Sequence, residues 1–289
     1  MSTPVAEVRP ADAGTAPGPD PFAEPALLRL PWPDAPFTSG DDCADPSCVA
    51  HADPTRPPDV PRRWPEVDRD GTIGWYRWIV GHHAAVCAWR LMVERLTDAL
   101  AGAPGAGTAV AELFDAYSAL LLYSGSCSPE TYAAVIRARM KARHPAFSGT
   151  WARDHEHVTA LVARFRPHAG TRLKQALKFN GYVHMGVGRR LVPAGKSLLR
   201  ESGGHAGAVT EADRDRFDEF FLIDRAPVCA AGFEGQTAER VGLALADLAV
   251  RPADVDYGDD RVNALQAALP THLERLRDLA RPAPRRDTP

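Results

Sequence analysis

The spacing of hydrophobic residues changes near residue 72. Before this point large apolar side chains stand singly among prolines, whereas after it they recur at three- and four-residue steps. The first such series lies on one face of a helix and comprises Trp75, Trp78, Ile79, His82, Val86, Trp89, Val93 and Leu96. The pattern predicts a long helix from residue 72 to about residue 100, ended by the glycine-rich run at 101–107.

The same periodicity predicts helices over most of the remaining chain. We expect them at about 108–123, 128–144, 151–166, 170–192, 195–201, 211–223, 234–248 and 259–280. Ser128 followed by Pro129 is typical of a helix start, and Thr150 is expected to cap the next helix. Thr210 with Asp213 resembles a capping box in which Asp replaces the usual Glu. Since no segment alternates as a strand does, we predict an all-α fold, with a single helical domain over residues 71–282.

The two ends of the chain are rich in proline. Residues 1–20 contain few large apolar groups and are expected to be disordered, and residues 283–289 are expected to form a tail. Residues 21–70 are also Pro-rich, but they include several leucines and aromatic residues. We therefore expect residues 21–70 to form an extended arm that packs on the helical core without regular structure.

The composition excludes several classes of partner. Hydrophobic residues make up 45% of the chain, charged residues make up 25%, and the formal net charge is −3. This balance offers no attraction for nucleic acid or for an anionic membrane. The N-terminus lacks the features of a signal peptide, and the longest apolar run, 116–123, is too short to span a bilayer. We expect a soluble cytoplasmic protein whose five cysteines are reduced.

Two histidines lie on the apolar faces of long predicted helices. His82 is expected near the middle of the tryptophan-rich face of the first helix, and His184 near the middle of the apolar face of the helix at 170–192. Gly181 and Gly188 stand three residues before and four residues after His184, although each glycine costs about 1 kcal/mol in a helix interior. The missing side chains would leave the flat space that a porphyrin needs beside a ligating histidine. Close packing of two helices would use the same glycines, and structural histidines would fit the same faces, so these interpretations stay open.

Two segments of the chain resemble a known superfamily. The run Ile79-Val80-Gly81-His82-His83-Ala84 resembles the distal-histidine helix of the tryptophan dioxygenases. Residues 113–137 and 144–154 resemble the bacterial heme-dependent tyrosine hydroxylases of lincomycin-, anthramycin- and hormaomycin-type antibiotic pathways. The resemblance covers about residues 20–250 and implies a tryptophan dioxygenase-like helical fold.

The resemblance also implies a reaction. Such enzymes bind heme b through one histidine and convert L-tyrosine to L-DOPA with hydrogen peroxide. His184 would be the axial iron ligand, and His82, or alternatively His83, would be the distal base. A related branch that acts on methyltyrosine attaches heme through a cysteine four residues after the axial histidine. Because that position is Gly188 here, no thioether link is expected. Because related enzymes often associate, this protein could also form a homo-oligomer.

The substrate-binding residues are less well defined by the sequence. Ser124 and Ser126 could hydrogen-bond the substrate or the heme edge, and Arg137 or Arg139 could grip the substrate carboxylate. The alternative is that the turn only joins two helices and that the arginines are solvated, as helical arginines commonly are. Ring-substituted tyrosines are possible substrates as well. Two alternative functions stay open: a heme dioxygenase that acts on an indole, and a non-catalytic helical binding protein.

Two further groups of possible metal ligands carry less weight. Cys43, Cys48 and His51 have a spacing reminiscent of zinc sites, but the sequence offers no evident fourth ligand, and we do not predict zinc from it. His155 and His157 are two positions apart, so they point to different faces of a helix and cannot chelate a metal together.

Overall fold

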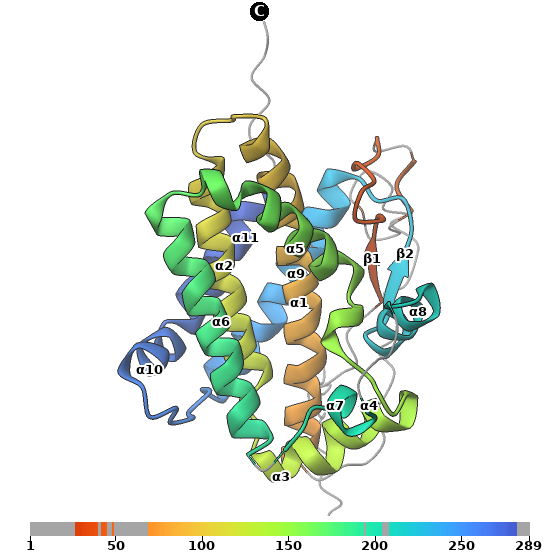
Figure 1. Cartoon of the computed structure of the whole chain (residues 1–289), viewed down its shortest axis with the longest axis vertical. Coiled ribbons are helices and arrows are strands. Elements are labelled where there is room, and N and C mark those ends of the chain that lie inside the picture. The colour runs from red at the N-terminus through yellow and green to blue at the C-terminus, as the bar shows by residue number, and fades with distance from the viewer. Residues whose placement is uncertain are drawn as a thin grey trace, which may run out of the picture.

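The structure, a computed structural model, describes residues 27–39, 42–44, 48, 69–193, 195–203 and 208–281. The described part is mostly helical with little strand (Figure 1), which confirms the all-α class. The tails expected at 1–20 and 283–289 lie outside the described residues, as does much of the arm. None of the helices described here is long and apolar enough to cross a lipid bilayer.

A central helix, α1, organises the bundle. It packs against α2, α5 and α9, while α6 and α11 cover α2 (Figure 1). Their buried side chains form one continuous hydrophobic cluster. The bounds of these helices are α1 Arg69–Leu100, α2 Ala106–Ser124, α5 Arg153–Phe165, α6 Thr171–Leu191, α9 Ala230–Val250 and α11 Leu269–Ala280.

The predicted helix starts are partly confirmed. α8 (Glu211–Phe220) begins with the expected capping box, in which the Asp213 amide donates to the Thr210 hydroxyl at 3.2 Å. Ser128 caps the short helix α3 (Pro129–Thr131) as expected. The start predicted at Thr150 is wrong, because Thr150 lies inside a 3-10 turn (Gly149–Trp151) and α5 follows at Arg153.

Two helices predicted as continuous are interrupted. The segment after Ser128 passes from α3 through a π-helical stretch (Tyr132–Arg137) into α4 (Ala138–Arg143). π-helical turns occur often at functional sites and leave no clear signature in hydrophobic spacing. The predicted helix at 259–280 divides into α10 (Asp260–Ala267) and α11, where Pro270 cannot donate the backbone hydrogen bond that continuity requires. The piece expected at 195–201 is the single turn α7 (Leu198–Glu201).

A small parallel sheet corrects the expectation that the arm has no regular structure. β1 (Leu28–Leu30) pairs with β2 (Ile223–Arg225), which follows α8 through Leu222 in a left-handed conformation with φ 54°. Both leucines of β1 are fully buried, so this part of the arm does pack on the core. Strands of three residues are too short for alternation to reveal them, and their partner lies far away in the sequence.

Candidate active site

His82 lies on α1, and one of its ring nitrogens is fixed by a backbone carbonyl. Its Nδ1 lies 2.6 Å from the carbonyl oxygen of Trp78, and a carbonyl can only accept, so Nδ1 carries the proton. The lone pair is therefore on Nε2, for which the described residues supply no partner. Burial, reinforced by the nearby His184, lowers the pKa of His82 to about 4. At neutral pH His82 is thus an uncharged imidazole with a free basic nitrogen.

His83, the alternative distal residue, has partners on both ring nitrogens. Its Nδ1 accepts from the Arg240 guanidinium at 3.1 Å, so Nε2 carries the proton that is donated to the carbonyl oxygen of Phe221. The side chain is completely buried, and burial together with Arg240 lowers its pKa to about 3. His83 therefore joins α1 to α9 and to the end of α8, while the ring of Phe221 stacks on His82 at 4.3 Å.

His184 lies at the edge of the buried stripe of α6 and not in its middle. At 100° per residue, Gly181, His184 and Gly188 share one flank of the helix, next to the buried side chains of Val183 and Val187. His184 is exposed, and no hydrogen bond to its ring occurs within the described residues. The protein around it still lowers its pKa below the ordinary value by desolvation.

The two glycines beside His184 border open space. A Cβ atom built at Gly181 or Gly188 would meet no atom within 4 Å. By contrast, a Cβ at Gly81 would collide with the Ser124 hydroxyl, because α1 and α2 pack closely there. Of the two interpretations of the α6 glycines, open space therefore describes the structure, and close helix packing does not.

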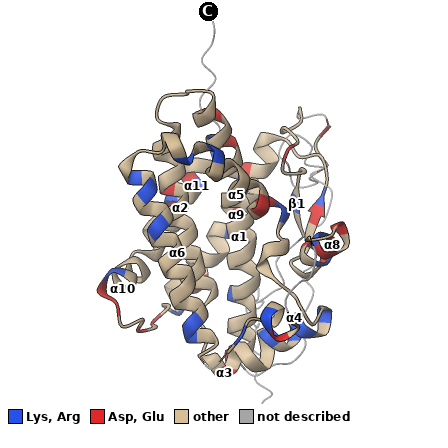
Figure 2. Cartoon of the chain, viewed as in Figure 1, with Lys and Arg blue, Asp and Glu red and all other residues tan. Residues whose placement is uncertain are grey.

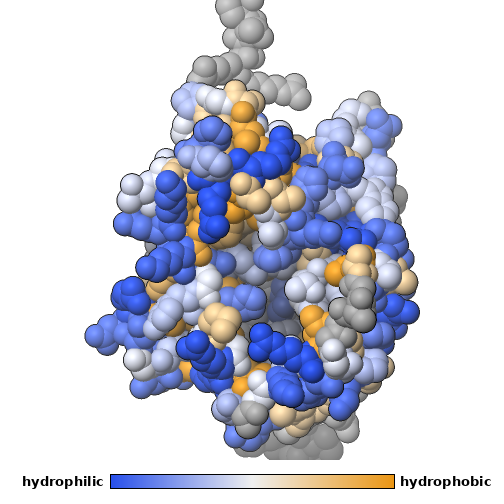
Figure 3. Space-filling model, in the orientation of Figure 1, coloured by the Kyte–Doolittle hydropathy of each residue, from blue (hydrophilic) through white to orange (hydrophobic). Residues whose placement is uncertain are grey.

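Three imidazoles from different helices face the same region. His184 on α6 lowers the pKa of His82 on α1 and also that of His155 on α5, which shows that these rings lie near one another. In Figure 1, α6 faces α1, and α5 crosses near one end of both; Figure 3 shows the surface hollowed between them. The ring of His155 also contacts Trp89 at 5.1 Å. Sequence reasoning missed His155 because it considered only pairing with His157.

The indole of Trp78 adds an unpaired donor to this region. Its ring lies 4.3 Å from that of His82 and 5.7 Å from that of Tyr132, which belongs to the π-helical stretch. The indole N–H is buried and has no hydrogen-bond acceptor within the described residues. Buried donors are nearly always satisfied, so an acceptor on a bound molecule would fit here.

The other predicted substrate-binding residues are held by the protein itself. Ser124 is buried and donates to the carbonyl of Leu120, and Ser126 accepts from Arg77 at 3.0 Å. Arg137 pairs with Glu201 at 2.7 Å. Within the described residues, none of these contacts links Ser124, Ser126 or Arg137 to His82 or His184.

Arg139 has a different setting. It lies on α4, where basic residues gather in Figure 2. Its guanidinium lies over the ring of Trp75, 4.4 Å from the ring centre, on the helix that carries His82. Arg139 therefore contacts the helix that carries His82 directly, through Trp75.

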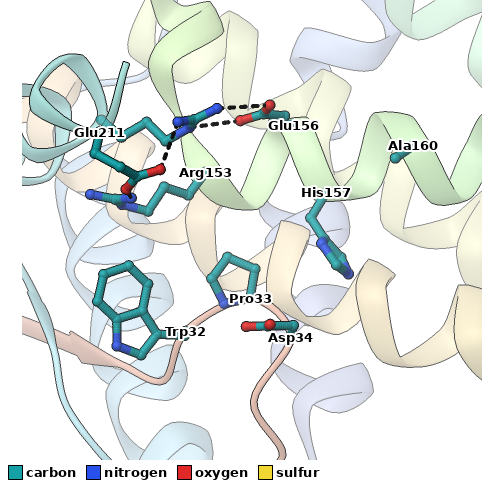
Figure 4. Close-up of a pocket in the computed structure, with 9 residues that line it drawn as sticks. Trp32, Pro33, Asp34, Arg153, Glu156, His157, Ala160 and Glu211 are labelled. Carbon is teal, nitrogen blue, oxygen red and sulfur yellow. Dashed lines mark hydrogen bonds and ion pairs between the residues drawn. The ribbon is translucent and has the colours of Figure 1, made fainter. Parts of the chain in front are cut away.

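A separate cavity of about 390 Å³ lies between the arm, α5 and the start of α8 (Figure 4). Arg153 lies over the Trp32 ring at 4.8 Å and pairs with Glu211, and Arg214 pairs with Glu156 at 2.9 Å. These ion pairs join α5 to α8, and the contact of Arg153 with Trp32 attaches the arm to them. A second cavity of about 180 Å³ includes Ser126.

A known protein family matches part of the chain. The family described as SfmD 3-methyl-L-tyrosine peroxygenase matches residues 37–180, about half of the chain. The chain is similar to this peroxygenase family. None of the curated proteins matches it. The matched residues include His82 and end four positions before His184, so the similarity supports a peroxygenase-type enzyme and does not extend to His184. The relation to tryptophan dioxygenases stays a prediction.

Proposed function

We propose that this protein is a heme-dependent peroxygenase that hydroxylates the phenol ring of a tyrosine-type amino acid. The observation that carries the proposal is the placement of His184 on an open, glycine-bordered flank of α6, near enough to the His82 imidazole to lower its pKa. The similarity to a peroxygenase family supports the class of reaction.

The residues present fit a heme. A porphyrin needs a histidine nitrogen and a flat clearance beside it, and His184 between Gly181 and Gly188 offers both. His184 would hold the iron, and the heme would supply the oxidising chemistry that peroxide drives. Because position 188 has no thiol, the heme is held without a thioether link there.

His82 moves protons in this proposal. The carbonyl of Trp78 fixes the proton on Nδ1, so Nε2 accepts a proton from peroxide or from the substrate phenol. The same nitrogen returns the proton to the oxygen that leaves as water. The overall reaction inserts one oxygen atom of hydrogen peroxide into a ring C–H bond and releases one water molecule. His83 holds the position of α1 and takes no proton, since both of its nitrogens are bonded.

The substrate is a tyrosine whose ring position beside the phenol oxygen is hydroxylated, which gives L-DOPA from L-tyrosine. The amino-acid carboxylate is assigned to Arg139, since it lies over Trp75 on the face of α1 that also carries His82. The indole N–H of Trp78 is a second donor toward a bound acceptor. The description of the similar family names 3-methyl-L-tyrosine, so both amino acids are candidates.

A product assay tests the proposed reaction. Purified heme-loaded protein is mixed with hydrogen peroxide and with L-tyrosine or 3-methyl-L-tyrosine, and products are identified by mass spectrometry. We expect a catechol that carries one added oxygen, and with oxygen-18-labelled peroxide that oxygen carries the label. L-Tryptophan converted to a product with two added oxygens, without any catechol from the tyrosines, would point to the indole dioxygenase instead.

A further inference from the structure

Three cysteines from distant parts of the chain converge beside the start of α9. Cys43 and Cys48 come from the arm, and Cys229 is the residue that caps α9. Their sulfur atoms all lie within 4.8 Å of one another, and those of Cys48 and Cys229 are 3.3 Å apart. Cys48 and Cys229 are buried and Cys43 is half-buried, so the three sulfur atoms form a compact and largely buried cluster.

The backbone around the cluster favours thiolates. The amide of Gly232 donates to the sulfur of Cys229 at 3.3 Å, and the amide of Cys229 donates to the sulfur of Cys43 at 3.3 Å. A thiolate is the form in which cysteine binds metals.

We infer that Cys43, Cys48 and Cys229 are ligands of a structural zinc ion. Zn–S bonds of about 2.3 Å in a tetrahedron place the sulfur atoms about 3.8 Å apart, which falls within the spread of this cluster. A tetrahedral site has a fourth position, which a further donor fills in structural zinc sites. His51, which shares the sequence pattern, lies outside the described residues, and the inference uses the three cysteines alone.

The sequence could not assemble this site, because Cys229 is 181 residues from Cys48. A metal here would tie the arm to the segment between β2 and α9. The backbone already joins these segments, through Thr38 to Val228 at 3.0 Å and Ala44 to Pro227 at 2.7 Å. The zinc site is independent of the proposed heme site, which uses other residues.

Metal analysis of the full chain tests the inference. The protein is produced with added zinc, and zinc and iron per chain are measured together by inductively coupled plasma mass spectrometry. We expect about one zinc per chain in the wild type, as for a structural site of this ligand type. Cys48→Ser and Cys229→Ser should each lose most of this zinc, whereas Cys127→Ser, a change of a half-buried cysteine outside the cluster, should keep it.

The variants are chosen so that they fold. Serine at position 229 retains a good helix cap, and circular dichroism checks the helix content of each variant. Alkylation followed by mass spectrometry gives a second measurement: Cys43 should resist iodoacetamide in the zinc-loaded protein and react after the zinc is chelated.

Three results would overturn the inference: a wild type without zinc, zinc retained in folded Cys48→Ser, or a Cys48–Cys229 disulfide in protein purified without reductant. The iron content of the same samples reports on the heme, so the two proposals succeed or fail separately.

Discussion

At the residue scale, two adjacent histidines on α1 have different surroundings because a helix points them 100° apart. His82 keeps a free Nε2, while His83 is locked between Arg240 and the carbonyl of Phe221. The sequence placed both on α1 but could not separate their roles, since Arg240 and Phe221 lie about 140–160 residues away.

We predict that replacing His82 removes the chemistry and leaves the cofactor. His82→Ala should lower kcat/KM for tyrosine hydroxylation by about 10²–10⁴-fold, the usual contribution of a general base. The Soret band and the iron content should stay close to those of the wild type. His157→Ala on α5, which lies at the separate ion-paired cavity, is the control and should keep its activity. An active His82→Ala enzyme would refute the proton-transfer role.

The low pKa of His83 predicts a pH dependence of stability. Between the ordinary pKa of 6.5 and the folded value of about 3, the unfolded chain binds a proton that the folded chain does not. Stability therefore falls as the pH drops through this window, by up to about 1.4 kcal/mol per pH unit for one proton. His83→Gln can keep both hydrogen bonds but binds no proton, so its stability should fall less steeply. Urea unfolding at pH 7, 6, 5 and 4 measures this, and equal slopes would count against the assignment.

At the scale of single elements, α6 shows what hydrophobic spacing can and cannot give. The spacing predicted the helix and the position of the glycines around His184, but not which neighbour the glycine flank faces. The neighbour of this flank depends on the packing of α6 against α2, which leaves α1 and α5 on the other side of α6 (Figure 1). The π-helical turn at Tyr132–Arg137 and the break at Pro270 were likewise settled by packing and local backbone geometry.

We predict that a large side chain on the glycine flank blocks the cofactor without harming the helix. Gly188→Leu meets open space, so the unfolding free energy of protein prepared without heme should be unchanged or up to about 1 kcal/mol higher. Heme binding, measured by titration of the absorption spectrum, should be lost. Gly186 also borders open space but lies on the opposite flank, so Gly186→Leu should bind heme normally. Equal heme binding by both variants would exclude a heme on the His184 flank.

At the scale of the whole molecule, the arm completes the core. The leucines of β1 are buried in the core, but the pairing of β1 with β2 and the ion pairs of Arg153 could not be seen in the sequence. Their partners lie far apart along the chain, and single-sequence patterns report only local spacing. The same reason hid the cysteine cluster, whereas the helical class and the capping box at Thr210 depend on local signals and were predicted correctly.

We predict that the arm contributes to global stability through its buried leucines. Leu30→Ala empties a fully buried position and should lower the unfolding free energy by about 2–5 kcal/mol. Leu27, which is 43% exposed, provides the matched control, and Leu27→Ala should change stability by less than about 0.5 kcal/mol. Thermal or urea unfolding gives both values, and equal losses would mean that β1 does not pack as described.

The central claim is that His184 holds a heme, and the absorption spectrum of the purified protein tests it most directly. Wild type, His184→Ala and the exposed-face control Gln175→Ala on the same helix are produced with ample heme precursor. We predict a Soret band in the wild type and in Gln175→Ala, and its loss or strong shift in His184→Ala, with iron content falling in parallel. No Soret band in the wild type after heme reconstitution, or an unchanged band in folded His184→Ala, would contradict the claim.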